Sequence, residues 1–169
     1  MKITVIGTGY VGLVVGTGLA ENGHFVKCVD RDESKIAQLT QGKLPIYEPG
    51  LEELVARNVE EERLKFTSDL EGSVAESLLV FICVGTPSRE DGSADVSEVM
   101  ACAEQIAAAM RNYLIVVIKS TCPLGTADAM KKFIAERTSQ PFDVVVNPEF
   151  LKEGAAMDDF MRPDRVLIG

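Results

Sequence analysis

The sequence predicts an α/β fold, with a doubly wound, mainly parallel sheet that carries helices on both faces. Short apolar runs alternate with amphipathic stretches along the 169 residues, the runs are rich in Val and Ile, and the stronger runs are apolar on both faces. Such strands are typical of a parallel sheet that is covered by helices on each side. Strict alternation of strand and helix favours right-handed crossovers between parallel strands.

Six apolar runs are the predicted strands. They lie at Ile3–Ile6, His24–Val29, Leu64–Thr67, Leu78–Val84, Tyr113–Lys119 and Asp143–Val146. A seventh short run, Arg165–Gly169, is expected to be either an edge strand or a place where a longer protein was cut.

Helical patterns separate these runs. A helix is predicted over Val11–Glu21, and another is predicted after Pro49, because proline is favourable at a helix start. Apolar residues recur at helical spacing in three segments, which gives each segment one face for the core. These faces are Leu51, Leu54, Val55 and Val59; Val96, Val99, Met100, Ala103, Ile106 and Ala107; and Ala127, Met130, Phe133 and Ile134.

Composition excludes several classes of protein. The length predicts one domain, 1–169, and an apolar content of 46% excludes a disordered chain. The sequence has 17 Lys and Arg against 26 Asp and Glu, a net charge of −9, so it lacks the basic surface that nucleic-acid binding needs. No apolar run approaches the roughly 20 residues of a membrane span. We therefore expect neither a nucleic-acid partner nor a membrane partner.

The cysteines indicate a reducing compartment. The four cysteines are far apart and the sequence has one histidine, so no zinc site or other metal site is expected. Three of the four lie in apolar or helical stretches, which is typical of reduced, buried thiols in a cytoplasmic protein.

A glycine-rich turn directly follows the first predicted strand. Residues 7–12 read Gly-Thr-Gly-Tyr-Val-Gly and open the predicted helix, and Asp30 ends the second strand 18 positions after Gly12. This arrangement is the fingerprint of Rossmann-like dinucleotide binding. Gly7 allows a tight turn, Gly9 lets the backbone approach a pyrophosphate, and Gly12 lets helix and strand pack closely. The helix N-terminus offers free N–H groups and a partial positive charge to the phosphates.

Asp30 predicts which dinucleotide binds. Its carboxylate would accept hydrogen bonds from the adenosine ribose hydroxyls and would repel a 2′-phosphate, which favours NAD over NADP. The neighbouring Arg31 leaves NADP open as an alternative, because an arginine at this place can bind the 2′-phosphate.

Polar segments rich in Pro and Gly follow the last three of the six predicted strands, at 84–87, 120–126 and 147–154. Ligands in an open parallel sheet bind beyond the carboxyl ends of the strands, so these segments predict a ligand crevice that is shared with the dinucleotide. A hydroxyl such as that of Thr121 can position a water or polarise a substrate oxygen, and a carboxylate such as that of Glu149 can act as a general base.

Six motifs cover nearly the whole chain. They are GTGYVG at 7–12, VDRDESKI at 29–36, PIYEPGLEEL at 45–54, VGTP at 84–87, KSTCPLGT at 119–126 and NPEFLKEGAAMDDFMRPDRVLIG at 147–169. In this order and spacing the sequence resembles the UDP-glucose/GDP-mannose dehydrogenase family. The last motif is most similar to the branch of that family that oxidises UDP-glucose.

The resemblance implies an NAD-dependent oxidation of the C6 alcohol of UDP-glucose to a carboxylate, in two hydride transfers. The aldehyde stage would be held on a cysteine as a thiohemiacetal and then oxidised to a thioester. The implied cofactor-binding residues are Gly7, Gly9, Tyr10, Val11, Gly12, Asp30, Lys35, Thr86, Thr121 and Glu153. The implied substrate-binding residues are Glu149, Phe150, Leu151, Lys152 and Glu153. The implied catalytic residues are Thr121, Glu149 and Glu153, of which Thr121 and Glu149 would manage the catalytic water and Glu149 would be the base.

The nucleophilic cysteine of that family lies in a later glycine-rich motif, which this sequence does not contain. We therefore expect the chain to be the NAD-binding domain of a longer, homo-oligomeric enzyme, able to bind NAD but not to turn over substrate alone. Cys122, which precedes a proline, is expected to be a packing residue, and Cys83 is expected to be inert. GDP-mannose or a UDP-N-acetylhexosamine as the substrate, and a non-catalytic NAD-binding module, stay open as alternatives.

Overall fold

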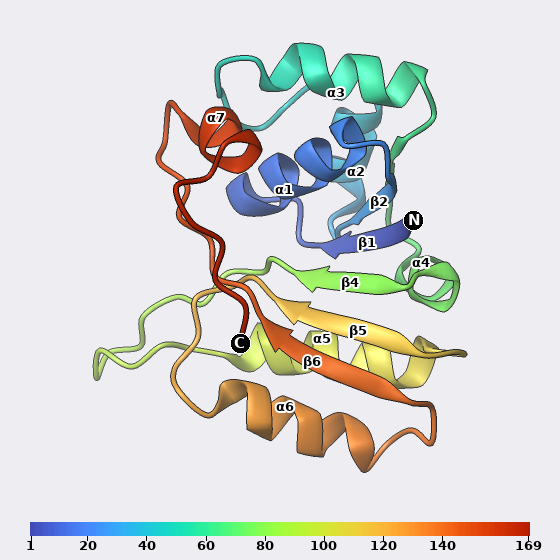
Figure 1. The fold of residues 1–169 in the computed structure, drawn as a ribbon, viewed down its shortest axis with the longest axis vertical. Coiled ribbons are helices and arrows are strands. Elements are labelled where there is room, and N and C mark those ends of the chain that lie inside the picture. Colours follow the sequence, from blue (N-terminus) through green and yellow to red (C-terminus); the bar gives the residue numbers. More distant parts are fainter.

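Six parallel strands form one sheet in the order β3-β2-β1-β4-β5-β6 (Figure 1). The structure is a computed structural model and describes residues 1–169. Every pair of neighbouring strands is parallel. The strands are β1 (Lys2–Ile6), β2 (Phe25–Val29), β3 (Leu64–Thr67), β4 (Leu79–Ile82), β5 (Leu114–Ile118) and β6 (Phe142–Val146). The predicted doubly wound parallel sheet is confirmed, and each of the six predicted runs matches one strand to within two residues at either end.

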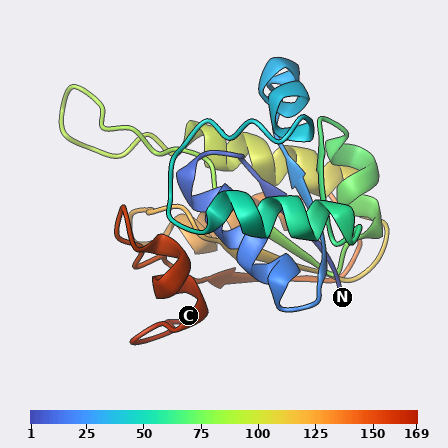
Figure 2. The same ribbon diagram turned by 90° about the horizontal axis from the view of Figure 1, so that it is seen from above.

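Helices cover both faces of the sheet (Figures 1 and 2). α1 packs against α3 and α7 on one face, whereas α5 packs between α4 and α6 on the other. None of the helices is long and apolar enough to cross a membrane. The helices are α1 (Tyr10–Glu21), α2 (Glu33–Thr40), α3 (Leu51–Glu60), α4 (Leu70–Glu76), α5 (Ser97–Ala109), α6 (Thr126–Ala135) and α7 (Ala156–Met161).

The central strands bury side chains on both faces, as their apolar sequence predicts. Ile3 and Val5 of β1 belong to the core beneath α1, and Ile6 belongs to the core beneath α5. In β4, Phe81 faces the first core and Ile82 the second. The two cores fix the strand ends between two helical layers, so the loops at those ends start from rigid positions.

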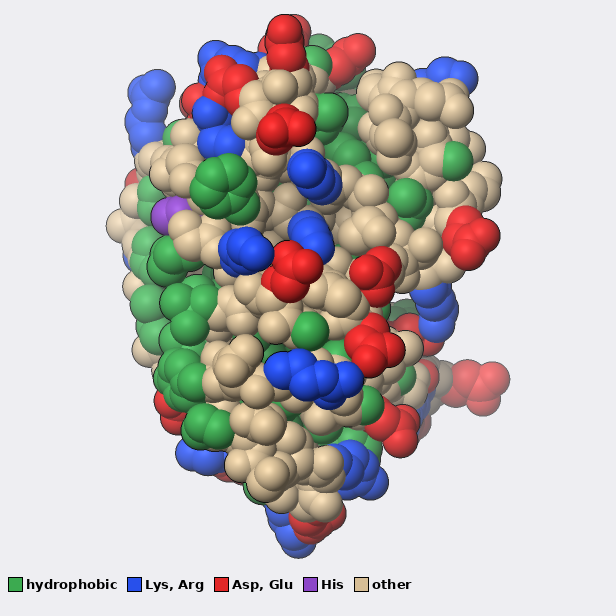
Figure 3. Space-filling model, turned by 90° about the vertical axis from the view of Figure 1, so that its right-hand side faces the viewer, with side chains coloured by type: hydrophobic (Ala, Val, Ile, Leu, Met, Phe, Trp, Pro, Cys, Tyr) green, Lys and Arg blue, Asp and Glu red, His purple; other side chains and the backbone are tan.

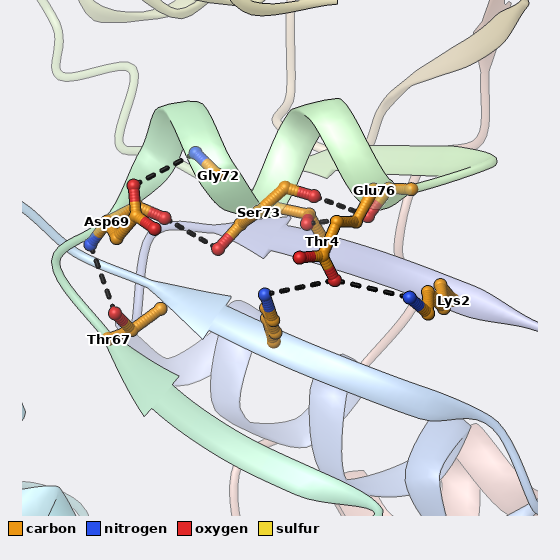
Figure 4. Close-up of polar contacts among 9 residues, drawn as sticks. Lys2, Thr4, Thr67, Asp69, Gly72, Ser73 and Glu76 are labelled. Atoms are coloured by element: carbon orange, nitrogen blue, oxygen red, sulfur yellow. Dashed lines mark hydrogen bonds and ion pairs between the residues drawn. The ribbon is translucent and has the colours of Figure 1, made fainter. Parts of the chain in front are cut away.

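α4 was not predicted, because its seven residues carry little apolar periodicity. Polar contacts stabilise this helix (Figure 4). The Asp69 carboxylate accepts a hydrogen bond from the Gly72 N–H at 2.9 Å, and the Ser73 hydroxyl donates to the Asp69 carbonyl oxygen at 2.6 Å. The Ser77 hydroxyl, just after the helix, lies 2.8 Å from the hydroxyl of Thr4 in β1. The N-cap therefore stabilises the start of this short helix, and the hydroxyl pair attaches its end to the centre of the sheet.

The predicted apolar face of α3 is wrong at its last position. Val59 is exposed, and the neighbouring Asn58 is buried instead. The Asn58 amide donates to the Glu21 carboxylate at 2.9 Å and to the Leu54 carbonyl oxygen at 2.8 Å, and its oxygen accepts from Arg63 at 3.0 Å. A buried amide whose donors and acceptor are all paired carries no large desolvation penalty, so this polar residue can replace the apolar one in the core.

The run Arg165–Gly169 does not form the edge strand that we considered. Its residues are exposed and have no regular structure. Only its end meets the sheet, where Gly169 and Val146 exchange two backbone hydrogen bonds of 2.7 and 2.9 Å. The side chain of Asn147 adds a bond to the Leu167 carbonyl oxygen at 2.8 Å.

Candidate functional site

The carboxyl ends of all six strands lie at one edge of the sheet, on the left in Figure 1. The loops that leave this edge carry Gly9 after β1, Asp30 after β2, Thr86 after β4, Thr121 after β5 and Glu149 after β6. β1 and β4 are adjacent where the strand order reverses, which is the place where open α/β sheets bind ligands. On the opposite end of the molecule, acidic and basic side chains are interspersed (Figure 3).

The glycine-rich turn has little room for side chains at two of its positions. Gly7 has a φ of 97°, and a Cβ there would lie 2.8 Å from the Cys83 carbonyl oxygen. A Cβ on Gly12 would lie 1.8 Å from the Gly7 carbonyl oxygen. A Cβ on Gly9 would meet no atom within 4 Å, so the turn is open to the exterior there. Gly9 is also the N-cap of α1, and no side chain caps the first-turn N–H groups of this helix, which leaves them available to an anion.

The Asp30 carboxylate lies against this turn and accepts four hydrogen bonds. One oxygen accepts from the Thr8 N–H at 2.9 Å, the Thr8 hydroxyl at 2.7 Å and the Lys35 ammonium at 2.8 Å. The other accepts from the Asp32 N–H at 3.1 Å. Burial by itself would raise the pKa of the Asp30 carboxyl, but these donors outweigh it and hold the pKa at about 2. The structure thus brings two predicted cofactor residues, Asp30 and Lys35, into an ion pair.

The side chain of Arg31 is already engaged in an ion pair. Its guanidinium pairs with the carboxylate of Glu98, in the first turn of α5, at 3.0 Å. The arginine side chain is 82% exposed, so the pair is weak and easily exchanged. The alternative that Arg31 holds a 2′-phosphate therefore requires this ion pair to open.

The loops after β4, β5 and β6 are tied together by polar contacts. The Thr86 hydroxyl donates to the Thr121 carbonyl oxygen at 2.8 Å, and Thr121 itself is exposed. The buried Lys119 ammonium donates to the side-chain oxygen of Asn147 at 3.1 Å and to the Pro148 carbonyl oxygen at 3.4 Å. Burial lowers the pKa of Lys119, and the negative charge of Glu149 opposes this effect.

The remaining predicted substrate residues lie in the same loop. The half-buried Glu149 accepts a hydrogen bond from the Leu151 N–H at 2.6 Å, which fixes its carboxylate on the turn. Phe150, Leu151 and Lys152 line a cavity of about 520 Å³ that also contacts α1 and the buried Lys119. Glu149 and Thr121 do not line this cavity. The cavity is therefore lined by Phe150, Leu151 and Lys152 of this loop, whereas Glu149 lies outside the lining.

Sequence reasoning missed Glu48, which contacts both the glycine-rich turn and the loop after β6. Its carboxylate is buried and accepts hydrogen bonds from the Tyr10 hydroxyl at 2.8 Å and from the N–H groups of Gly154 and Ala156 at 2.9 and 2.7 Å. Burial and Glu48 raise the pKa of Tyr10, and the negative charge of the exposed Glu153 adds to the effect. A glutamate between Tyr and Pro in a polar loop gives no sequence signal of burial.

Val11 completes the set of predicted residues, and it lies in the first turn of α1. Its side chain is half-buried and packs against the core of that face. The sequence-predicted residues thus lie on five loops and at the starts of two helices, α1 and α2, at a single edge of the sheet.

All four cysteines are free thiols, and three of them are buried as predicted. Burial raises the pKa of Cys83 and of Cys102 to about 12, and it raises the pKa of Cys28 further. Cys122 is half-buried, and burial raises its thiol pKa as well. A thiolate is the reactive form of cysteine, so none of the four has the environment of a nucleophile. The structure contains no group of three or more His, Cys, Asp or Glu side chains that could hold a metal ion.

Comparisons with known proteins match the whole chain. Residues 1–169 match the family model described as "UDP-glucose/GDP-mannose dehydrogenase family, NAD binding domain". A UDP-glucose 6-dehydrogenase of Rhizobium meliloti (strain 1021) is 57% identical over 172 residues, which cover 100% of this chain and 39% of that protein. A UDP-glucose 6-dehydrogenase of Pseudomonas aeruginosa is 52% identical over 174 residues, covering 100% of this chain and 38% of that protein.

Solved structures of such enzymes share the fold. A UDP-glucose dehydrogenase from the hyperthermophilic archaeon Pyrobaculum islandicum superposes with a TM-score of 0.94 at 42% identity, over 99% of this chain and 40% of that one. A ternary complex of GDP-mannose dehydrogenase from Pseudomonas aeruginosa superposes with a TM-score of 0.96 at 37% identity, over 100% of this chain and 41% of that one. This chain spans about two fifths of the length of the relatives that it matches.

Proposed function

This chain belongs to the UDP-glucose/GDP-mannose dehydrogenase family as an NAD-binding domain, and from that premise we propose that the polypeptide carrying it oxidises UDP-glucose to UDP-glucuronate. One observation carries the proposal: the glycine-rich turn and Asp30 lie at the same sheet edge as Thr86, Thr121 and Glu149. A domain that only bound NAD could use the turn, Asp30 and the two threonines, but it would have no use for Glu149, which the resemblance assigns to the substrate and to catalysis. The two relatives with the highest identity described above are both named as UDP-glucose 6-dehydrogenases.

The residues at this edge fit NAD. The open position at Gly9 and the uncapped first turn of α1 suit a pyrophosphate, and Asp30 suits the ribose hydroxyls. The Asp30 carboxylate already accepts four hydrogen bonds, so we propose that ribose hydroxyls share it with Lys35 and do not find it free. NAD supplies the hydride acceptor for the oxidation.

We assign the chemistry of the sugar to the loops after β5 and β6. The exposed Thr121 hydroxyl positions a water, and the Glu149 carboxylate, held by the Leu151 N–H, accepts a proton from it. Phe150 and Lys152 contact the sugar nucleotide from the wall of the cavity. Glu153, exposed at the end of the same loop, contributes to both cofactor and substrate binding.

We place the nucleophilic cysteine outside residues 1–169, because burial raises the pKa of all four thiols of this chain. The domain then binds NAD but does not turn over substrate by itself. We further propose that the intact enzyme is a cytoplasmic homo-oligomer. The buried, unpaired cysteines support a reducing compartment.

The test uses the intact polypeptide that carries this chain. NADH formation is measured with UDP-glucose, GDP-mannose and a UDP-N-acetylhexosamine in parallel, and we expect oxidation of UDP-glucose with two NADH per sugar. Glu149→Gln is expected to lower kcat by about 100-fold, the usual contribution of a general base. Glu104→Gln, on the exposed side of α5, is the matched control. A preference for another sugar nucleotide would change the substrate assignment, and unchanged rates in Glu149→Gln would refute the role of Glu149 as the base. No NADH formation with any of the three sugar nucleotides would support a binding module.

A further inference from the structure

Glu48 is a buried acidic side chain in a loop that is largely exposed. It is 4% exposed, whereas its neighbour Tyr47 is 88% exposed. No cation pairs with it: its three hydrogen-bond donors are the Tyr10 hydroxyl and the N–H groups of Gly154 and Ala156. Burying a carboxylate without a counter-ion is costly unless hydrogen bonds satisfy its oxygens. The three donors therefore make the burial of Glu48 possible, and they hold its side chain in place.

The donors come from two parts of the candidate site that are far apart in the sequence. Tyr10 is the first residue of α1 and follows Gly9 directly, whereas Gly154 and Ala156 follow the loop that carries Glu149 and Lys152. The Tyr10 hydroxyl also lies 3.3 Å from the Lys152 carbonyl oxygen. Glu48 therefore joins the helix that begins the dinucleotide site to the segment that ends the sugar-binding loop.

The carboxylate has to be ionised for this arrangement. Burial raises the pKa of Glu48, but the three donors outweigh it, so the pKa lies below its ordinary value. A protonated acid or an amide at position 48 would carry a hydrogen of its own. That hydrogen would face at least one of the three groups that donate to the carboxylate. The two backbone N–H groups cannot turn into acceptors, and at least one of them would then lose its partner.

We propose that Glu48 is a positioning residue for the dehydrogenase reaction, which holds the loop 149–154 against the first turn of α1. This inference rests on the function proposed above. Its effect on catalysis runs through other residues: it fixes the backbone beside Lys152 and Glu153 relative to the turn at Gly9. Sugar contacts and dinucleotide contacts are then kept at a fixed separation, which a hydride transfer requires.

The test compares Glu48→Gln with Glu53→Gln in the intact polypeptide. Glu53 is exposed on α3 and makes no hydrogen bond or ion pair, so its variant controls for the loss of one negative charge nearby. In Glu48→Gln we expect kcat/KM for UDP-glucose to fall by about 100-fold, since small misplacements of reacting groups cost that much. The dissociation constant of NAD is expected to change less than about threefold, because Asp30 and the Val29 carbonyl oxygen still hold Thr8 and Gly7 of the glycine-rich turn when Glu48 is changed.

A second variant keeps the test informative if Glu48→Gln does not fold. Tyr10→Phe removes one donor and leaves both backbone N–H bonds, and we expect a fall in kcat/KM of about tenfold. The double variant should lose less than the product of the two single losses, because both changes remove the same contact. Hydrogen exchange at the amides of Gly154 and Ala156 should accelerate in Glu48→Gln and stay unchanged in Glu53→Gln.

Each outcome has one meaning. An active wild type whose Glu48→Gln and Glu53→Gln variants have equal kcat/KM would refute the role of Glu48 and leave the proposed function standing. Equal losses of NAD affinity and of sugar kcat/KM would also refute it, because they would show general damage to the domain. A wild type that oxidises no sugar nucleotide would refute the proposed function itself, whatever the exchange at Gly154 shows.

Discussion

Replacing Asp30 by Asn should reduce stability and NAD affinity together. The pKa of the Asp30 carboxyl falls from 3.8 to about 2 on folding, and such a difference corresponds to about 2 kcal/mol of stabilisation at neutral pH. The asparagine keeps the shape but loses the charge that faces Lys35. We therefore expect the free energy of unfolding to fall by about 2 kcal/mol. We also expect the NAD dissociation constant to rise by about tenfold, since a ribose acceptor is weakened.

The stabilisation that Asp30 provides should depend on pH, because its carboxyl has a lower pKa in the folded chain than in the unfolded chain. Above pH 3.8, the ordinary pKa, the carboxyl is ionised in both folded and unfolded chains, so its stabilisation is complete. As the pH falls below that value the unfolded chain takes up a proton first, and the stabilisation declines until it is lost near the folded pKa of about 2. Urea unfolding of wild type and Asp30→Asn, followed by circular dichroism, should give curves that differ at neutral pH and converge below about pH 4. A difference that stays constant down to about pH 3 would refute the reasoning.

Three further predictions follow from contacts at the same edge. Gly12→Ala should lower the free energy of unfolding by on the order of 1–3 kcal/mol in urea titrations, because its Cβ would meet a carbonyl oxygen at 1.8 Å. Gly9→Ala, whose Cβ meets nothing within 4 Å, should instead keep that stability and weaken NAD binding; the opposite order would contradict the turn geometry. Glu98→Ala should release Arg31 and raise the affinity for NADP severalfold in calorimetry, with the NAD affinity unchanged; equal NADP affinities would show that the ion pair does not matter. Cys83, whose pKa burial raises to about 12, should resist iodoacetamide in the folded protein and react after unfolding, as mass spectrometry would record; rapid labelling of the native protein would contradict its burial.

The sequence predicts the sheet well because the strands are buried on both faces. A short apolar run could be a buried strand or part of a buried helix, and the Gly and Pro residues that flank these runs favour a strand. No bounds were predicted for α2, α4 and α7, which have eight, seven and six residues. All three are too short for a helical period to be visible. The misplaced apolar residue in α3 has a different cause: Asn58 is buried because Glu21, Arg63 and a carbonyl satisfy its amide, and two of those partners lie outside its helix.

Site residues that belong to one continuous sequence motif were predicted, whereas residues whose partners are distant in the sequence were not. The turn at Gly9 and the aspartate after β2 lie in one continuous motif, and their positions relative to the strands follow from a known fold pattern. Glu48 pairs with groups 38, 106 and 108 residues away along the chain. No periodicity or spacing rule connects positions that distant, and a glutamate in a loop is exposed more often than not. The ion pair of Asp30 with Lys35 was also not anticipated, although both residues were assigned to the cofactor.

The distribution of acidic groups explains how a chain with a net charge of −9 can bind an anionic dinucleotide. The two carboxylates joined to the glycine-rich turn, those of Asp30 and Glu48, each accept at least three hydrogen bonds, and Asp30 also faces a lysine. Charges elsewhere on the surface are screened over about 10 Å at ordinary salt concentrations, so the N–H groups at the start of α1 determine the local field. Two opposite expectations for Asp30→Asn follow. If repulsion between the Asp30 carboxylate and the phosphates of NAD dominated, Asp30→Asn would bind NAD more tightly. Because Lys35 and the other local donors already offset this negative charge, we expect the loss of a strong hydrogen-bond acceptor for the ribose to dominate. NAD binding should therefore weaken.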